Sequence, residues 1–283
     1  MPIIFNQDSK PAIARGDNVA VQRLIDSSVA TRDQVRLERW RMAEGSAADI
    51  TVRPGDIAWI EVLDGHAELS GSVAAQNFGT HSLSNVHLAF LPGGFAGRVT
   101  STRGAVILRA EVPDAARFDP AFATSPPGFR VVDWSEEPVL DSEHDARKRI
   151  YFVTPRLFAT KALSGEMIIY PPGTAAANHY HEGAEHFQYV VRGRGSVISD
   201  GTPHQLRAGD IVWNHERECH YFIAGPDDEF VFVEFFVPGT FKTIWVDDAP
   251  ICTWAPTGRN IKGGKASRDI ARHSTADSSS EPD

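Results

Sequence analysis

The chain has 283 residues, of which 42% are hydrophobic and 23% charged, the usual balance of a globular protein and enough for two cores. Its formal net charge is −9 and it has no basic stripe, which argues against a nucleic-acid binder because phosphate binding needs a clustered positive surface. No apolar run approaches the roughly 18 residues that span a bilayer, so no membrane segment is predicted. The two cysteines lack disulfide spacing and residues 1–10 lack the pattern of a signal peptide; we therefore expect a cytoplasmic protein.

From the N-terminus onward, short apolar runs alternate with Gly, Pro, Asp and Asn. Their length and their aromatic and β-branched content predict strands rather than helices. The clearest examples are residues 57–63, 105–112, 166–170, 187–191 and 230–237. Only residues 17–28 and 140–148 are candidates for short helices. Regularly spaced short strands indicate an all-β sandwich or barrel.

An internal repeat divides the chain into two halves. When the sequence is shifted against itself by 128 residues, Gly45 coincides with Gly173 and Gly65 with Gly193. We therefore expect one barrel in residues 1–115 and a second in residues 149–261. Residues 116–148, which begin with a proline-rich stretch, would form a linker, and the polar segment 262–283 would be a disordered tail.

The second half carries the chemistry. His179 and His181 alternate along a predicted strand, so both imidazoles would face the same side and form half of a metal site. A third ligand would come from the strand that follows, which offers Glu185 and His186. A fourth would come from His220, at the start of a later strand.

This pattern resembles the cupin superfamily. Gly173, His179, His181 and Gly193 match the first cupin motif, and Gly209 and His220 match the second. The resemblance implies two jelly-roll β-barrels in tandem (a bicupin), with the metal held by His179, His181, His220 and one residue of the following strand. Counting back from Gly193 gives His186 for that residue, whereas counting on from His181 gives Glu185. We favour His186, because the distance to the closing glycine keeps the strand in register, and keep Glu185 as the alternative.

The N-terminal half has lost these ligands. The same offset places Thr51 and Arg53 at the positions of the two alternating histidines, Ala58 at that of His186, and the second-motif remnant ends in Gly97. We therefore expect residues 1–115 to form a degenerate, metal-free barrel.

Three further residues are candidates for catalysis. Gln188 shares a face with His186 if the strand is regular, and Glu234 lies within the very apolar run 230–237. A carboxyl group there would orient a ligand imidazole or exchange protons. His215 would line the cavity mouth or be an ordinary loop histidine.

The metal and the reaction follow from donor type and resemblance. Imidazole ligands suit iron, copper, nickel and zinc, and a carboxylate would add manganese; we expect Fe(II). The resemblance implies a metal-dependent dioxygenase that cleaves a small aromatic or enolisable substrate. The alternatives are a non-redox lyase, isomerase or decarboxylase with a Lewis-acid metal, and a non-catalytic metal- or ligand-binding protein. The partner would be a small molecule, and the protein a monomer or homodimer.

Overall fold

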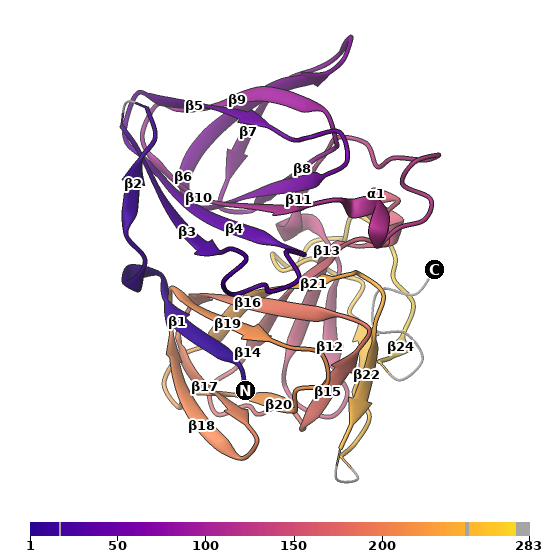
Figure 1. The fold of residues 1–283 in the computed structure, drawn as a ribbon. Coiled ribbons are helices and arrows are strands. Elements are labelled where there is room, and N and C mark those ends of the chain that lie inside the picture. Colours follow the sequence, from indigo (N-terminus) through magenta and orange to yellow (C-terminus); the bar gives the residue numbers. More distant parts are fainter. Residues whose placement is uncertain (17, 247–248, 276–283) are drawn as a thin grey trace. The chain divides into compact units, whose positions relative to one another are not determined.

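The computed structural model describes residues 1–16, 18–246 and 249–275, and these residues are almost entirely β-strand. They form two compact units (Figure 1). Unit 1 consists of Met1–Gln7, Ser135–Leu157 and Leu163–Asp283, and unit 2 of Asp8–Trp134 and Phe158–Ala162. The predicted all-β, two-barrel architecture is confirmed. The one α-helix of the described residues, α1 (Pro155–Phe158), is a single turn, and no described helix could cross a membrane.

Unit 2 is an antiparallel barrel with an apolar interior. Its strands are β2 (Ala12–Ala14), β3 (Val19–Ile25), β4 (Arg36–Met42), β5 (Ser46–Thr51), β6 (Ile57–Val73), β7 (Gln76–Ser84), β8 (His87–Leu91), β9 (Phe95–Ser101), β10 (Ala105–Val112) and β11 (Arg130–Asp133). The long strand β6 pairs with β8 and β10 in one part and with β7 and β9 in the other, which joins the two sheets of the barrel. Alternate β6 residues Ala58, Ile60 and Val62 enter a core that also contains Trp40 and Phe95.

Unit 1 has two sheets. Its strands are β1 (Ile3–Asn6), β12 (Val139–Ser142), β13 (Lys148–Val153), β14 (Ser164–Tyr170), β15 (His179–Glu182), β16 (Glu185–Arg192), β17 (Arg194–Ser199), β18 (Thr202–Arg207), β19 (Asp210–Asn214), β20 (His220–Ala224), β21 (Phe230–Val237), β22 (Lys242–Trp245), β23 (Thr253–Pro256) and β24 (His273–Ser274). The nine-stranded sheet has the order β1-β19-β16-β21-β14-β13-β12-β23-β24 and the five-stranded sheet the order β18-β17-β20-β15-β22. Residues of both sheets, such as Ile168 and Phe222, share one core cluster, so the core lies between the sheets.

The glycines of the internal repeat have the same structural role in both units. Gly65 and Gly193 have φ of +75° and +81°. A Cβ on Gly65 would lie 2.2 Å from the Gly104 carbonyl oxygen, and one on Gly193 would lie 2.0 Å from that of Glu229. Both positions therefore require glycine, for its backbone freedom and for the close approach of a neighbouring strand. This equivalence explains why the offset of 128 residues aligns the two halves.

Several predictions about the segments between and after the barrels are wrong. The expected helices 17–28 and 140–148 are not helical in their described residues, 18–28 and 140–148, since these contain strands β3 and β12; residue 17 lies outside the described residues. The expected linker 116–148 contains β11 of unit 2 and β12 of unit 1, because its apolar residues pair with strands of each unit. The described part of the expected tail, 262–275, is folded: β24 pairs with β23 and Ile270 is buried in a core cluster. The rest of that tail, 276–283, lies outside the described residues.

Candidate metal centre

Three histidines of unit 1 converge on one point. His179 and His181 point to the same side of β15, as alternate residues of a strand do, and His179 stands opposite His220 of β20 in the antiparallel register. One ligand nitrogen from each of the three rings can be chosen so that all lie within 4.8 Å of one another. His181 and His220 are buried, at 5% and 1% exposure. The sequence motif and the strand pairing thus produce one cluster.

Hydrogen bonds fix how these rings present their nitrogens. His179 Nδ1 lies 2.9 Å from the Ala177 carbonyl oxygen and His220 Nδ1 lies 2.8 Å from that of Glu218. A carbonyl only accepts, so each Nδ1 carries the proton and each Nε2 keeps its lone pair. His181 Nδ1 lies 3.2 Å from Thr243 Oγ1, which can play the same role.

Burial keeps the histidines neutral. It lowers the pKa of His179, His181 and His186 well below the usual value, and repulsion between the neighbouring imidazoles lowers them further. Burial also lowers the pKa of His220. Neutral imidazole is the form that binds a metal. The donor set and its fixed tautomers therefore fit a divalent transition-metal ion.

Strand β16 of the nine-stranded sheet brings His186, not Glu185, next to this cluster. His186 Nε2 lies 3.2 Å from His220 Nε2, and two nitrogens bound to one ion at about 2.0–2.1 Å would be about 3.0–3.4 Å apart. Glu185 lies on the opposite face of β16 by strand alternation. Its carboxylate instead stands 3.6 Å from Nδ1 of His215. His215, for which the sequence leaves open the cavity mouth or an ordinary loop position, is not among the residues that line the cavity next to the cluster.

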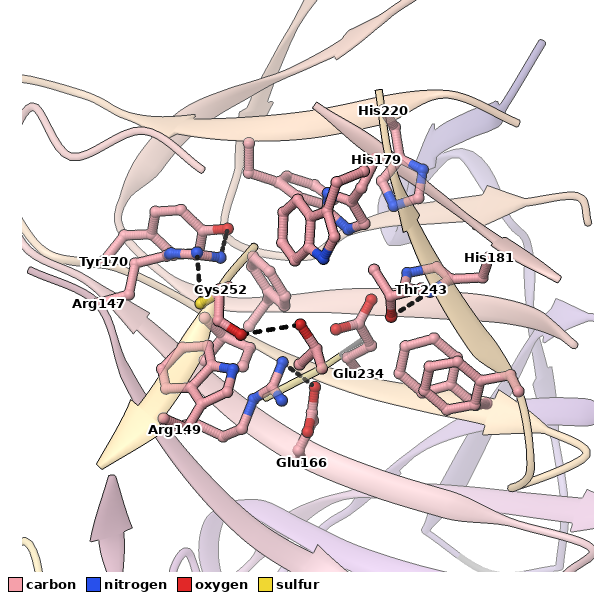
Figure 2. A pocket seen from close by; sticks show the side chains of 18 residues that line it. Arg147, Arg149, Glu166, Tyr170, His179, His181, His220, Glu234, Thr243 and Cys252 are labelled. Atoms are coloured by element: carbon pink, nitrogen blue, oxygen red, sulfur yellow. Dashed lines mark hydrogen bonds and ion pairs between the residues drawn. The ribbon is translucent and has the colours of Figure 1, made fainter. Parts of the chain in front are cut away.

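That cavity extends from the histidines into the unit (Figure 2). Only about 30 Å³ of it can hold the centre of a water molecule, so it suits a small ligand. Phe222, Phe232 and Phe236 supply apolar wall. Its polar wall comes from the three histidines and from charged residues of the nine-stranded sheet.

Glu234 of β21 lies in this wall, and a neighbouring amide holds it. Gln188 Nε2 donates to Glu234 Oε1, and Gln188 itself accepts a bond of 2.9 Å from Asn214 Nδ2. Glu234 Oε1 also lies 3.5 Å from His186 Nε2. Burial, reinforced by the nearby carboxyl of Glu166, raises the pKa of Glu234 to about 8. Gln188 is fully buried and orients Glu234 rather than lining the cavity.

Sequence reasoning missed the basic side of the cavity. Arg147 lies just before β13 and Arg149 lies in it. Both line the cavity, together with Glu166 and Tyr170 of β14. Arg149 Nη2 pairs with Glu166 Oε1 at 3.1 Å, and Arg147 Nη2 pairs with Asp145 at 2.8 Å. The alternation of Arg147, Arg149 and Tyr151 is the sequence signal that these side chains share one face of a strand. The expected linker 116–148 hides this signal, because it ends within the strand.

The fold and the site together define a two-barrel cupin architecture with one histidine cluster in unit 1. Residues 166–236, which carry all four clustered histidines, match the family described as "Cupin domain". The comparison with curated proteins gave no match.

The solved structures that resemble the chain include several of oxalate decarboxylase. A structure from a study of its substrate binding mode and reaction specificity switch has a TM-score of 0.69. A structure from a study of the Mn(II) centres of the Bacillus subtilis enzyme has a TM-score of 0.68. A third, from a study of a structural element that modulates proton-coupled electron transfer, has a TM-score of 0.69. Each is 14% identical and covers 86% of this chain and 79% of the other. At this identity the likeness shows the shared bicupin fold.

Proposed function

We propose that this protein is a metal-dependent cupin enzyme that uses one divalent transition metal as a Lewis acid on a small organic molecule, in a lyase or decarboxylase reaction. The metal would be held by His179, His181 and His220, with His186 as a fourth ligand. The observation that carries the proposal is the convergence of three histidines, two of them buried, whose ligand nitrogens lie within 4.8 Å of one another beside a small polar cavity.

The chain's own residues support a proton-transfer role next to such an ion. When bound, the metal would polarise a carbonyl or carboxyl oxygen of the substrate. The neutral histidines leave the ion its full charge, which favours an electron-rich ligand. Glu234 stands in the cavity wall with a raised pKa, so its carboxyl group can hold a proton near neutral pH and exchange it with a bound molecule. Gln188 fixes the orientation of that group.

The fold neighbours favour this alternative over the dioxygenase interpretation. The proteins they are named for are decarboxylases, and one study names Mn(II) as their metal. For this chain we propose Fe(II), which imidazole ligands suit, or Mn(II), the metal named for a fold neighbour. We propose iron and manganese equally as the bound ion.

Elemental analysis of the purified full-length protein and paired measurements of gas exchange test the proposal. We expect about one divalent transition metal per chain and, with a panel of small oxo acids and dicarboxylic acids, release of carbon dioxide or another fragment without stoichiometric oxygen uptake. Oxygen uptake in a one-to-one ratio with product formation would instead support the dioxygenase interpretation and contradict the lyase or decarboxylase reaction. Absence of bound metal after loading with Mn(II), Fe(II) and Zn(II) would contradict the proposal as a whole.

A further inference from the structure

Among the described residues that line the cavity, the buried side-chain polar atoms without a hydrogen-bond partner are all donors. Three of the lining residues carry one such N–H group each: Arg149 Nε, Trp245 Nε1 and Trp254 Nε1. An indole or guanidinium N–H can only donate. A buried donor without an acceptor is unfavourable, so three around one cavity indicate a ligand rich in oxygen acceptors.

Two of these donors and a second arginine form one end of the cavity, which we call the arginine end (Arg147, Arg149, Tyr170 and Trp254). The guanidinium of Arg149 lies 4.2 Å from the centre of the Trp254 ring. Arg147 Nη1 donates to Tyr170 Oη over 3.4 Å. Burial raises the pKa of Tyr170 to about 12, so this hydroxyl remains a donor as well. The arginine end therefore offers four side chains that can donate to one anionic group.

The third donor lies at the other end. Trp245 packs against His179, with ring centres 4.9 Å apart. Figure 2 shows the three histidines on one side of the cavity and Arg147, Arg149 and Tyr170 on the other, with Glu234 between them. A ligand that satisfies both ends must carry oxygen acceptors at both of its own ends.

Charge points to the same class of ligand. Asp145 balances Arg147, and Glu166 balances Arg149. The neutral histidines would not balance a divalent ion, so an occupied centre would leave a positive cavity that an anion neutralises. The cavity's small volume limits that anion to a few non-hydrogen atoms.

We propose that the substrate is a small organic acid with two oxygen-bearing ends. Its carboxylate accepts hydrogen bonds from Arg149 Nε and Trp254 Nε1 at the arginine end, and its second oxygen group faces the three histidines beside Trp245. The histidine end of this assignment rests on the proposed function, whereas the arginine end rests on the chain's own donors.

Titration calorimetry on the full-length protein, metal-free and loaded with Mn(II), tests the assignment. The probes are malonate, its neutral analogue malonamide, and inorganic phosphate. We expect malonate to bind roughly tenfold or more tightly than malonamide, as charge-assisted bonds predict, and to bind the loaded protein more tightly than the metal-free one. Equal binding of malonate and malonamide, or binding of phosphate alone, would overturn the assignment.

Two conservative variants locate the carboxylate. Trp254→Phe removes one N–H and retains an aromatic ring, and Arg149→Lys keeps the charge that pairs with Glu166 but removes Nε. Each should weaken malonate binding roughly tenfold with metal content unchanged. The matched control is Arg192→Lys, at an exposed ion pair with Glu229, which should bind malonate like the wild type.

These readouts separate the two proposals. Loss of malonate affinity with full metal content supports the arginine end. Unchanged malonate affinity in both variants overturns it while leaving the metal centre intact. A protein that binds no metal but still prefers malonate would contradict the proposed function alone. If a variant does not fold, the comparison of malonate with malonamide on the wild type still decides.

Discussion

Replacement of Thr243 by valine removes the one side-chain support of a proposed ligand ring. His179 and His220 donate their Nδ1 protons to backbone carbonyls, which substitution cannot remove, whereas His181 Nδ1 faces Thr243 Oγ1 at 3.2 Å. Valine has nearly the same shape, so the main change is a buried Nδ1–H without an acceptor. That costs about 1–3 kcal/mol, and since 1.4 kcal/mol is a factor of ten, metal affinity should fall roughly 10- to 100-fold, the range typical of groups that orient a ligand.

Competition for Zn(II) with a chromophoric chelator measures this change in affinity. Thr202→Val, at an exposed position of β18, is the matched control and should bind the ion like the wild type. Circular dichroism would verify that both variants are folded. Wild-type affinity in a folded Thr243→Val protein would refute the idea that this hydroxyl positions a metal ligand.

Three other predictions concern the histidine cluster and a buried carboxylate of unit 2. His220→Ala should lose most bound metal and activity together in elemental analysis and turnover assays, while His204→Ala, remote from the cluster, should change neither. His186→Ala should weaken metal binding and Glu185→Ala should not, because only the former faces the cluster; the opposite order would show that the register is wrong. Burial raises the pKa of Asp119, but hydrogen bonds from the 158–162 segment and Ala121 outweigh it and hold that pKa below the usual 3.8. Its stabilisation is therefore present above about pH 4 and lost as pH falls through the lower folded value. The free energy of unfolding, measured across the acid pH range, should fall less steeply with falling pH in Asp119→Asn than in the wild type. Equal slopes would contradict this.

The sequence predicted the features that depend on local periodicity. Strand alternation placed His179 and His181 on one face, and the closing glycine at 193 gave the register that brings His186 inward. Strands β6, β10, β14, β16 and β21 were predicted from their apolar runs. All of these features depend only on the two-residue period with which side chains alternate between the two faces of a strand.

The features that depend on distant pairing were not predicted. Arg147 and Arg149 are charged and follow a proline-rich stretch, so they were assigned to a linker and the boundary of the barrel, yet partners at Asp145, Glu166 and Tyr170 make their burial possible. His215 looked like a cavity residue by proximity to the second motif, but it faces Glu185. Single-sequence periodicity carries no information on such cross-strand partners.

The pairing of β1 with β19 has a consequence for how the protein is made. Asn6 donates a hydrogen bond to Asp210, 204 residues later in the chain. At translation rates of about 5–20 residues per second, β19 is synthesised roughly 10–40 s after β1, so β1 has no strand partner during that time. All strands of unit 2 have been synthesised by then, whereas the sheet that carries His186 lacks its edge until β19 arrives. A fragment starting at residue 149 would lack β1, and the exposed edge of β19 would invite pairing with other chains.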